Sequence, residues 1–317
     1  MTATEAGTVR VACRMHDWTR ALFEGKVPER AYHIQMHEQE NVGVEGLFGD
    51  TPVADYAECG LAGLVQACAN GTPVLAFPVF IRTTFRHSYI LIRSDRGINS
   101  PKDLEGKRIG TSYNTTATIW IRGLLQDGYG VQLDKISWLD IGAPGYKAPP
   151  GYQIERAERG TKLHDLLREG KIDALISFDA EMIHHQGSTT VKRLFPDAGK
   201  EEREWWRKTH VMPMMNVIAC AESRIKERPA EAQAVFDAFV AAKELGLKEL
   251  LNNRDSGLFW YWEALEEQLD LLGLDPVPYS VSKNRVPIET LLRYCAEQGI
   301  TNRQLGVEEV FYAGFDA

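Results

Sequence analysis

Two histidines stand beside charged residues, in positions where an imidazole could move protons. His87 lies in the segment Phe85-Arg-His-Ser, and His16 is followed directly by Asp17. The imidazole group changes its charge near neutral pH, so both side chains are candidate general acids or bases. Each also has a structural alternative. His87 could be a hydrogen-bonded packing residue, and Asp17 could cap a helix that starts near Trp18.

A second group of residues could hold an anion. Arg86 can grip a carboxylate with two parallel hydrogen bonds, and Ser88 can add a hydroxyl donor. Asn114, Thr115 and Thr116 open an expected helix, whose first backbone N–H groups and positive dipole end attract negative charge. The structural alternatives are a salt bridge for Arg86 and ordinary N-capping for the Asn-Thr-Thr turn. We predict that both groups bind a carboxylate.

The other predicted ligand contacts come after or near expected strands, because the carboxyl ends of parallel strands form the ligand crevice of an α/β sheet. Tyr113 and Phe178 could stack on an aromatic ring, although large aromatic residues more often belong to the core. The polar members of this set are Arg14, Arg20, Glu58, Ser112, Asp179 and Asn216.

We predict neither a metal site nor an organic cofactor. His33 and His37 lie four residues apart on an expected strand, and His184 and His185 are adjacent, but neither pair has the spacing of a zinc motif. A metal-assisted lyase that uses these histidines stays as a weaker hypothesis. The sequence has no glycine-rich phosphate loop, dinucleotide fingerprint or G-x-S-x-G motif, which argues against NAD, ATP and acyl-enzyme chemistry.

Composition and charge argue against several classes of partner. The 317 residues include 36 Lys and Arg against 44 Asp and Glu, so no basic surface is expected for nucleic acid or for an anionic membrane. No apolar run approaches the roughly 20 residues of a membrane helix. The N-terminus lacks the pattern of an export signal, and five cysteines without a C-x-x-C pair are typical of reduced thiols. We expect a cytoplasmic protein, and its Trp and Met segments leave a homodimer open.

The elements that must position these residues alternate between strands and helices. Runs rich in Val, Ile and Leu predict strands, and amphipathic stretches ended by Gly or Asn predict helices. The expected strands are 9–13, 31–37, 53–59, 72–80, 88–93, 108–111, 135–140 and 172–177, with a return strand within 210–219. The expected helices are 18–23, 60–69, 118–129, 161–169 and 229–251. This order is typical of an α/β fold with mixed or parallel sheets.

Two motifs resemble the second lobe of type II periplasmic binding proteins. The segment 100–110 reads S-P-K-D-L-E-G-K-R-I-G, and the segment 167–176 reads L-R-E-G-K-I-D-A-L-I. The resemblance implies a two-lobed α/β protein whose chain crosses twice between the lobes. Lobe one would comprise residues 1–93 and 211–317, with its helical C-terminal third packed on it, and lobe two would comprise residues 94–210. A small ligand would bind in the cleft between them.

A longer series of motifs narrows the resemblance to one family. In chain order these motifs are Pro78-Val-Phe, Phe85-Arg-His-Ser, the segment 100–110, Trp120-Ile-Arg-Gly-Leu-Leu, Arg193-Leu-Phe-Pro-Asp, Lys208-Thr-His-Val-Met-Pro-Met-Met and Arg293-Tyr-Cys-Ala-Glu-Gln-Gly-Ile. Together they resemble the 4,5-dihydroxyphthalate decarboxylase family across nearly the whole chain. The resemblance implies a cofactor-independent enzyme that removes one carboxylate from a hydroxylated aromatic diacid. His87, or His16 with Asp17, would then handle the proton.

A second hypothesis comes from a departure at the return strand. Met214-Met215-Asn216 stands where the family usually carries a histidine, and the segment that begins at Phe178 also differs from the family pattern. Because a fold does not dictate its function, the chain could instead be a non-catalytic binding protein for an aromatic acid or for a ligand that resembles a thiamine precursor. Either hypothesis makes a small aromatic carboxylate the expected partner.

Overall fold

The chain forms two compact units. The computed structural model describes residues 7–28, 31–40, 42–177, 187–253 and 256–315. Unit 1 comprises Met1–Thr83, Met214–Arg285 and Gly306–Ala317, and unit 2 comprises Thr84–Pro213 and Val286–Leu305.

The units differ from the expected lobes, 1–93 with 211–317 and 94–210, in two main segments. Residues 84–93 group with unit 2 because β5 (Ile90–Arg93) pairs with two strands of that unit's sheet. Residues 286–305 also group with unit 2, because Tyr294 of α9 (Arg285–Glu297) packs on Trp120 and Gly123. Hydrophobic periodicity indicates such a helix, but it carries no information about which sheet the helix covers.

Unit 1 is built on a five-stranded sheet with the order β2-β1-β3-β11-β4. Its strands are β1 (Thr8–Cys13), β2 (His33–Glu38), β3 (Tyr56–Gly60), β4 (Val74–Thr83) and β11 (Met214–Ala221). β2, β1 and β3 are parallel, and β11 is antiparallel to both of its neighbours. The carboxyl ends of β1, β3 and β4 therefore share one edge with the amino end of β11.

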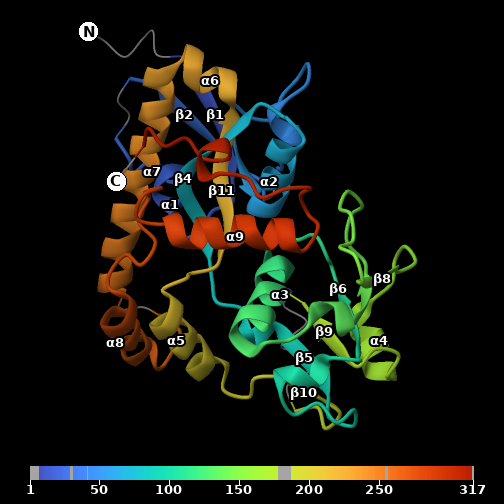
Figure 1. Cartoon of the computed structure of the whole chain (residues 1–317). Helices are drawn as coiled ribbons and strands as arrows, with labels where there is room; N and C mark the ends of the chain where they lie inside the picture. Colours follow the sequence, from blue (N-terminus) through green and yellow to red (C-terminus); the bar gives the residue numbers. More distant parts are fainter. Residues whose placement is uncertain (1–6, 29–30, 41, 178–186, 254–255, 316–317) are drawn as a thin grey trace. The chain divides into compact units, whose positions relative to one another are not determined.

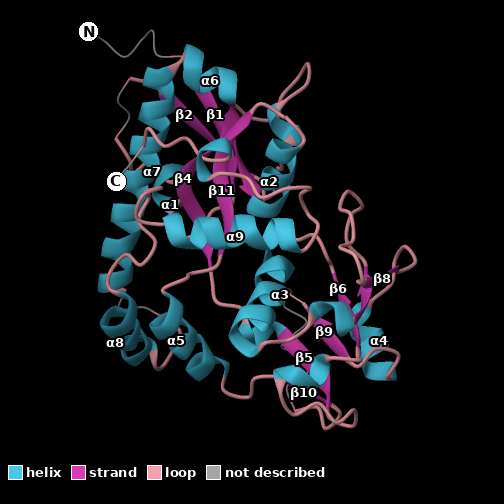
Figure 2. Ribbon diagram, in the orientation of Figure 1, coloured by secondary structure: helices cyan, strands magenta, loops and turns pink. Residues whose placement is uncertain are grey.

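Helices pack against this sheet (Figures 1 and 2). α2 (Leu61–Ala69) contacts β3, β4 and β11, and α7 (Pro229–Asn252) contacts β4 and α1 (Arg20–Phe23). Pro229 occupies the first turn of α7, where its missing N–H costs nothing. The other helices of the unit are α6 (Glu222–Glu227), α8 (Tyr261–Leu272) and the short 3-10 turns η1 (Glu45–Leu47) and η6 (Val307–Glu309).

Unit 2 has a six-stranded sheet with the order β10-β5-β9-β6-β7-β8. β6 (Arg108–Thr111) is parallel to β7 (Ser137–Asp140) and β9 (Ala174–Ile176), and β7 is parallel to β8 (Gln153–Arg156). β5 is antiparallel to β9 and to β10 (Val191–Arg193). The helical elements are α3 (Thr116–Tyr129), α4 (Leu163–Glu169), α5 (Ala198–Thr209), α9, η2 (His87–Tyr89), η3 (Pro101–Leu104) and η4 (Leu133–Lys135).

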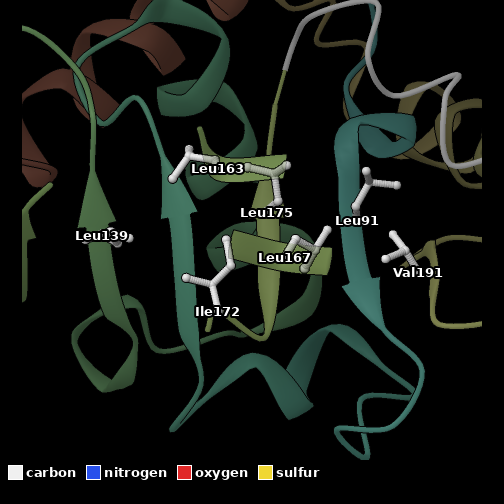
Figure 3. Close-up of a cluster of buried hydrophobic side chains, with 7 residues drawn as sticks. All are labelled: Leu91, Leu139, Leu163, Leu167, Ile172, Leu175 and Val191. Carbon is white, nitrogen blue, oxygen red and sulfur yellow. The ribbon is translucent and has the colours of Figure 1, made fainter. Parts of the chain in front are cut away.

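Aliphatic side chains from the sheet and from α4 form a core cluster in unit 2 (Figure 3). Its members are Leu91, Leu139, Leu163, Leu167, Ile172, Leu175 and Val191. A Cβ added at Gly110 of β6 would lie 2.8 Å from side-chain carbons of both Leu163 and Ile172. The missing side chain therefore lets α4 approach the sheet closely.

Most of the expected elements form, with shifts at their ends. β4 continues to Thr83 instead of ending at Phe80, and Ser88 lies in η2 instead of starting a strand. The expected strand at 53–59 begins at Tyr56, and α3 begins at Thr116. Strand and helix ends depend on long-range pairing and capping, which local patterns record poorly. Within the described ranges, no helix has the length and apolar character to cross a membrane.

Candidate active site

Polar side chains gather where the strand ends of unit 1 share an edge. Arg14 and His16 follow β1, Glu58 lies in β3, and Arg82 and Asn216 are paired across β4 and β11. Asn216 also pairs with Gly60, the residue that precedes α2. Parallel strands carry these residues to one place because their carboxyl ends point in the same direction. We call these five side chains, from Arg14 to Asn216, the unit 1 polar edge.

Glu58 and Arg14 form the buried ion pair of this edge. The Glu58 side chain is fully buried, and its Oε2 accepts a 2.9 Å hydrogen bond from the backbone N–H of Arg14. Arg14 Nε lies 3.5 Å from Glu58 Oε1, and a second guanidinium nitrogen lies 2.7 Å from Glu40. Burial raises the pKa of Glu58, partly offset by Arg14. Two carboxylates therefore already match the charge of Arg14.

His16 is held in a tight turn that leaves one ring nitrogen without a hydrogen-bond partner among the described residues. The backbone N–H of Trp18 donates to His16 Nδ1 at 3.2 Å, so the proton of the neutral ring sits on Nε2. Nε2 is buried and has no hydrogen-bond partner among the described residues. Burial lowers the pKa of His16 to about 4, and the charges of Arg14 and Arg82 act in the same direction. His16 is therefore neutral at pH 7 and presents an N–H donor.

Asp17 and Arg20 lie at the surface beside His16. Their side chains are 70% and 43% exposed and approach each other at 3.8 Å. An exposed pair of this kind contributes little to stability because solvent screens it. Neither ring nitrogen of His16 donates a hydrogen bond to Asp17, since Nδ1 accepts from Trp18 and Nε2 has no partner among the described residues. Their predicted roles in proton transfer and anion binding stay predictions.

Arg82 is the member of the edge that sequence patterns missed. The expected strand stops at Phe80, whereas β4 continues and places Arg82 opposite Asn216. The charge of Arg82 lowers the pKa of both His16 and Glu58, so its guanidinium lies near them. In the part of the chain that the structure describes, its side chain forms no ion pair or hydrogen bond. The only sequence signal for Arg82 as a strand residue would have been an alternation of apolar and polar residues that continued past Ile81.

His87 lies in unit 2, in a closed aromatic environment. Its ring is fully buried and contacts the rings of Phe195, Tyr129 and Trp205 at centroid distances of 5.2, 6.2 and 6.3 Å. Neither ring nitrogen has a hydrogen-bond partner within the described ranges, and Nδ1 lies 4.0 Å from Glu202 Oε1. Burial lowers the pKa of His87 to about 4. This environment favours a packing role.

Arg86 and Ser88 flank His87 in the same turn. The Arg86 guanidinium is buried and lies 4.8 Å from the centroid of the Tyr89 ring. Glu202 accepts hydrogen bonds from the backbone N–H groups of His87 and Ser88, and burial raises its pKa. A carboxylate of the protein itself therefore occupies the donors at the start of η2. Anion binding by Arg86 and Ser88 stays a prediction.

The predicted turn before α3 is built around a carboxylate that already accepts hydrogen bonds from four protein donors. Asp140, which ends β7, accepts hydrogen bonds from the N–H groups of Tyr113 and Gly142 at 2.8 and 2.6 Å. It also accepts from Tyr146 Oη at 2.7 Å and from Arg156 at 2.8 Å. Four donors satisfy this buried group, which sequence patterns did not single out. Asp140 therefore fixes the loop instead of offering a reactive oxygen.

Tyr113 belongs to the core of unit 2. Its ring is fully buried, stacks on Tyr146 at 4.7 Å and lies 3.6 Å from the Arg122 guanidinium. Arg122 is itself buried and donates to Tyr113 O at 2.7 Å and to Gln298 Oε1 at 2.8 Å. Contact of this ring with a ligand stays a prediction.

The side chains around the start of α3 lie close together. A Cβ added at Gly142 would lie 2.8 Å from Asn114 Oδ1 and 3.0 Å from Ser112 Oγ. Thr115 is the N-cap residue, but its hydroxyl donates to Ser112 O and makes no cap hydrogen bond to the helix. Thr116 begins the helix and is buried. The predicted anion contacts therefore share one turn, and anion binding there stays a prediction.

Phe178, Asp179 and the pair His184-His185 lie outside the described residues. His33 and His37 lie on β2, the edge strand of the unit 1 sheet. Across the described ranges, no three His, Cys, Asp or Glu side chains are grouped so that they could hold a metal ion.

The chain is similar to two curated proteins and to one family model. The model described as NMT1/THI5 like matches residues 50–149. The chain is 32% identical to 4,5-dihydroxyphthalate decarboxylase of Comamonas testosteroni over 320 residues, which cover 95% of each protein. It is 34% identical to 4,5-dihydroxyphthalate decarboxylase of Pseudomonas putida over 166 residues, which cover 49% of this chain and 64% of that protein.

Solved structures identify the fold. The periplasmic aliphatic sulphonate binding protein SsuA from Escherichia coli is similar with a TM-score of 0.58 and 13% identity, covering 98% of this chain and 93% of that chain. The desulfurization enzyme DSZB is similar with a TM-score of 0.52 and 15% identity, covering 97% of each chain. Likeness at these identities concerns the fold alone. The expected fold class, that of periplasmic binding proteins, is confirmed.

Proposed function

This chain belongs to the 4,5-dihydroxyphthalate decarboxylase family, and we propose that it removes one carboxylate from a hydroxylated aromatic dicarboxylic acid such as 4,5-dihydroxyphthalate. The observation that carries the proposal is the 32% identity to a protein of that name, maintained over 95% of both chains. Identity over this length includes segments of both units, so it is not a likeness of one domain alone. The unit 1 polar edge supplies cationic and proton-carrying groups that such a reaction needs.

The proposed reaction draws its electrons from the substrate and its proton from the enzyme. The phenolic oxygen para to the departing carboxylate pushes electron density to the ring carbon that bears it, and this carbon takes a proton from an acid of the enzyme. The bond to the carboxylate then breaks, its electron pair restores the aromatic ring, and CO2 leaves. Water reprotonates the acid. Because the phenol supplies the electrons, we propose that the reaction is cofactor-independent.

His16 is our candidate for the proton donor. Its Nε2 carries the ring proton and has no partner among the described residues, and it lies among groups that attract an anion. Burial lowers the pKa of His16 to about 4, whereas a carboxylate bound beside it would raise that pKa again, because negative charge stabilises the imidazolium. The substrate would thus promote the protonation that its own decarboxylation requires.

His87 is the other candidate. Its place between Phe195, Tyr129 and Trp205 leaves little room for a substrate beside the ring, so we rank it below His16. Substitution of His87 by phenylalanine would preserve the aromatic packing while removing both nitrogens. A His87→Phe protein with full turnover would eliminate His87 as the proton donor, and a protein with no turnover but a native melting curve would restore it.

A non-catalytic binding protein is the second candidate function. Asn216 stands in the unit 1 polar edge where the family pattern usually has a histidine, and an amide cannot transfer a proton near neutral pH. The sulphonate binding protein with the same fold shows that this architecture also serves binding alone. Binding without turnover would favour this candidate.

The experiment that separates the two candidates uses purified, chelator-treated protein and 4,5-dihydroxyphthalate. Release of CO2 and formation of the dihydroxybenzoate, followed by chromatography, would support the lyase. A binding isotherm without product would support the binding protein. Neither binding nor turnover with a series of hydroxylated phthalates would contradict the proposal. Retention of activity after chelation would also count against a metal-assisted lyase.

We propose a cytoplasmic location. All five cysteines are unpaired thiols, which is usual in a reducing compartment. Four of them are buried, and burial raises the pKa of these thiols, so they are packing residues with low reactivity. Fractionation of cells that produce the native chain tests this proposal, and recovery in the periplasmic fraction would contradict it.

A further inference from the structure

The charges of the unit 1 polar edge do not balance. Arg14 is matched by Glu40 at 2.7 Å and by Glu58 at 3.5 Å, and the neighbouring Arg20 is matched by Asp17. Arg82 is half-buried, and the described chain provides no carboxylate within ion-pair distance of its guanidinium. A partly desolvated cation without a partner costs free energy unless an anion compensates it. The edge therefore has a place for one anionic group beside Arg82.

The position of Arg82 shows which part of a ligand it would meet. Asn216 pairs with Arg82 on one side and with Gly60, at the start of α2, on the other. The Arg82 guanidinium is near enough to His16 and Glu58 for its charge to act on both. An anion held by Arg82 is thus a neighbour of the candidate proton donor.

Decarboxylation itself requires a second anchor. The carboxylate that leaves as CO2 loses its charge when the carbon–carbon bond breaks, so it cannot hold the ring in place through that step. A group that stays on the ring must do so, and binding energy from such a non-reacting group is what orients the reacting carbon. The planar guanidinium can hold a carboxylate through two parallel hydrogen bonds, which fixes both position and orientation.

We propose that Arg82 binds the carboxylate that remains on the product, and that it thereby restricts the enzyme to aromatic acids with two adjacent carboxylates. The inference rests on the proposed decarboxylase function. Arg14 differs from Arg82 because Glu58 and Glu40 neutralise it, so it shapes the edge without supplying net charge. Asn216 would add an amide hydrogen bond to the same carboxylate or to a ring hydroxyl.

The test measures ligand preference with Arg82→Gln and Arg82→Lys proteins. Phthalate and benzoate, which lack the activating hydroxyls, serve as unreactive probes in calorimetry. The wild-type protein is expected to bind phthalate at least about 10-fold more tightly than benzoate, since one hydrogen bond to a charged group contributes binding free energy of this size. Arg82→Gln should abolish the preference, because phthalate then has no anchor for its second carboxylate. Arg82→Lys should restore part of the preference, because lysine keeps the charge but cannot form the two parallel hydrogen bonds of a guanidinium.

The matched control is Arg285→Gln, at an exposed ion pair with Glu308 in the same unit. It should leave the phthalate preference unchanged. Melting curves of all variants establish that each is folded. Retention of the preference by a folded Arg82→Gln protein would overturn the inference, and so would a chain without any preference for phthalate.

Turnover separates this inference from the proposed function. If the chain decarboxylates 4,5-dihydroxyphthalate, Arg82→Gln should lower kcat/KM for this diacid about 10- to 100-fold. It should also weaken inhibition by the product 3,4-dihydroxybenzoate, which keeps the carboxylate that Arg82 holds. Unchanged product inhibition would overturn the anchor while the decarboxylase stands. Phthalate binding that depends on Arg82 in a chain without turnover would support the anchor and contradict the decarboxylase.

Discussion

The unit 1 polar edge and the cluster around Asp140 in unit 2 differ in how their buried polar groups are hydrogen-bonded. In unit 1, Glu58 Oε1 and His16 Nε2 are buried without a hydrogen-bond partner in the described chain, and Arg82 has no matching carboxylate there. In the Asp140 cluster, four donors satisfy the buried carboxylate, and the nearby buried Arg122 donates to two oxygens, although its Nη1 has no partner in the described chain. Both clusters follow strands of a sheet, so position alone does not distinguish them.

The difference separates groups that hold the fold from groups that can act on a ligand. A polar group with all its hydrogen bonds made has nothing left to offer a substrate, and it contributes to rigidity. A buried polar group without a hydrogen-bond partner lowers the stability of the fold. Such groups are usually found at sites where function requires them. Hydrogen-bond saturation therefore distinguishes the Asp140 cluster from the unit 1 polar edge, although it does not separate His16 from His87, whose ring nitrogens also lack partners in the described chain. Four changes test the comparison.

The largest effect is expected from Asp140→Ala. The change leaves Arg156 and three further donors without their acceptor, so the free energy of unfolding should fall by about 3–5 kcal/mol. Urea unfolding followed by circular dichroism measures the loss. The control Asp165→Ala, at an exposed pair with Arg168, should change stability by less than about 0.5 kcal/mol. Similar small losses for both variants would remove the distinction between the units.

The next effect is on catalysis, from His16→Gln. Glutamine keeps hydrogen-bonding capacity but cannot donate a proton as an acid, so kcat should fall about 100-fold with little change in melting temperature. The control His87→Phe should keep kcat within about 3-fold. Initial rates across a range of pH supply the check, because the proton donor should also shift the pH profile. A reversed result would move the proton donor to unit 2.

The third effect is a pH dependence that arises from His87. Burial lowers its pKa to about 4, so between that value and its unfolded pKa the unfolded chain binds more protons than the folded chain. Stability is therefore lost as the pH falls through this window. The loss attributable to His87 should be about 2 kcal/mol between pH 7.5 and pH 5. His87→Phe should remove this part of the slope, as urea titrations at several pH values would show; an unchanged slope would assign the dependence to other groups.

The smallest effect on stability is expected from Glu58→Gln. Burial raises the pKa of Glu58, so the charged form costs stability at neutral pH, and the amide removes that cost while Arg14 loses one partner. The two changes nearly cancel, and the free energy of unfolding should move by no more than about 1 kcal/mol. Thermal melts measure it. A loss as large as that of Asp140→Ala would make Glu58 a structural group and the unit 1 polar edge a second saturated cluster.

Local sequence patterns predicted the strands better than the contacts of their end residues. β1 and α2 follow from short apolar runs and a Gly or Asn stop, which act within a few residues. The rule that ligands meet strand ends correctly brought Arg14, His16 and Glu58 to one edge. It could not tell that Arg122 and Tyr146 would cover the Tyr113 ring, because these residues are distant in sequence.

Arg82 and α9 are further cases in which a contact between distant segments could not be predicted from a local pattern. The extra residues of β4 are ordered by pairing with β11, more than a hundred residues later in the chain, so no local pattern marks Arg82 as a strand residue. Likewise, nothing in the periodicity of α9 shows that its Tyr294 fits against Gly123. Contacts between segments far apart in the sequence determine both the length of β4 and the position of α9.

The packing of Tyr294 on Gly123 also bears on how the chain is made. Unit 2 needs Val286–Leu305 from near the end of the chain, and unit 1 needs the final segment from Gly306. On the ribosome, the residues up to Pro213 emerge first, at about 5–20 residues per second, with α9 and its tyrosine still unsynthesised. Unit 2 therefore cannot complete its core before Val286–Leu305 has been synthesised, and unit 1 cannot do so before the segment from Gly306 has followed. Until then, chaperones have access to the unfinished surfaces.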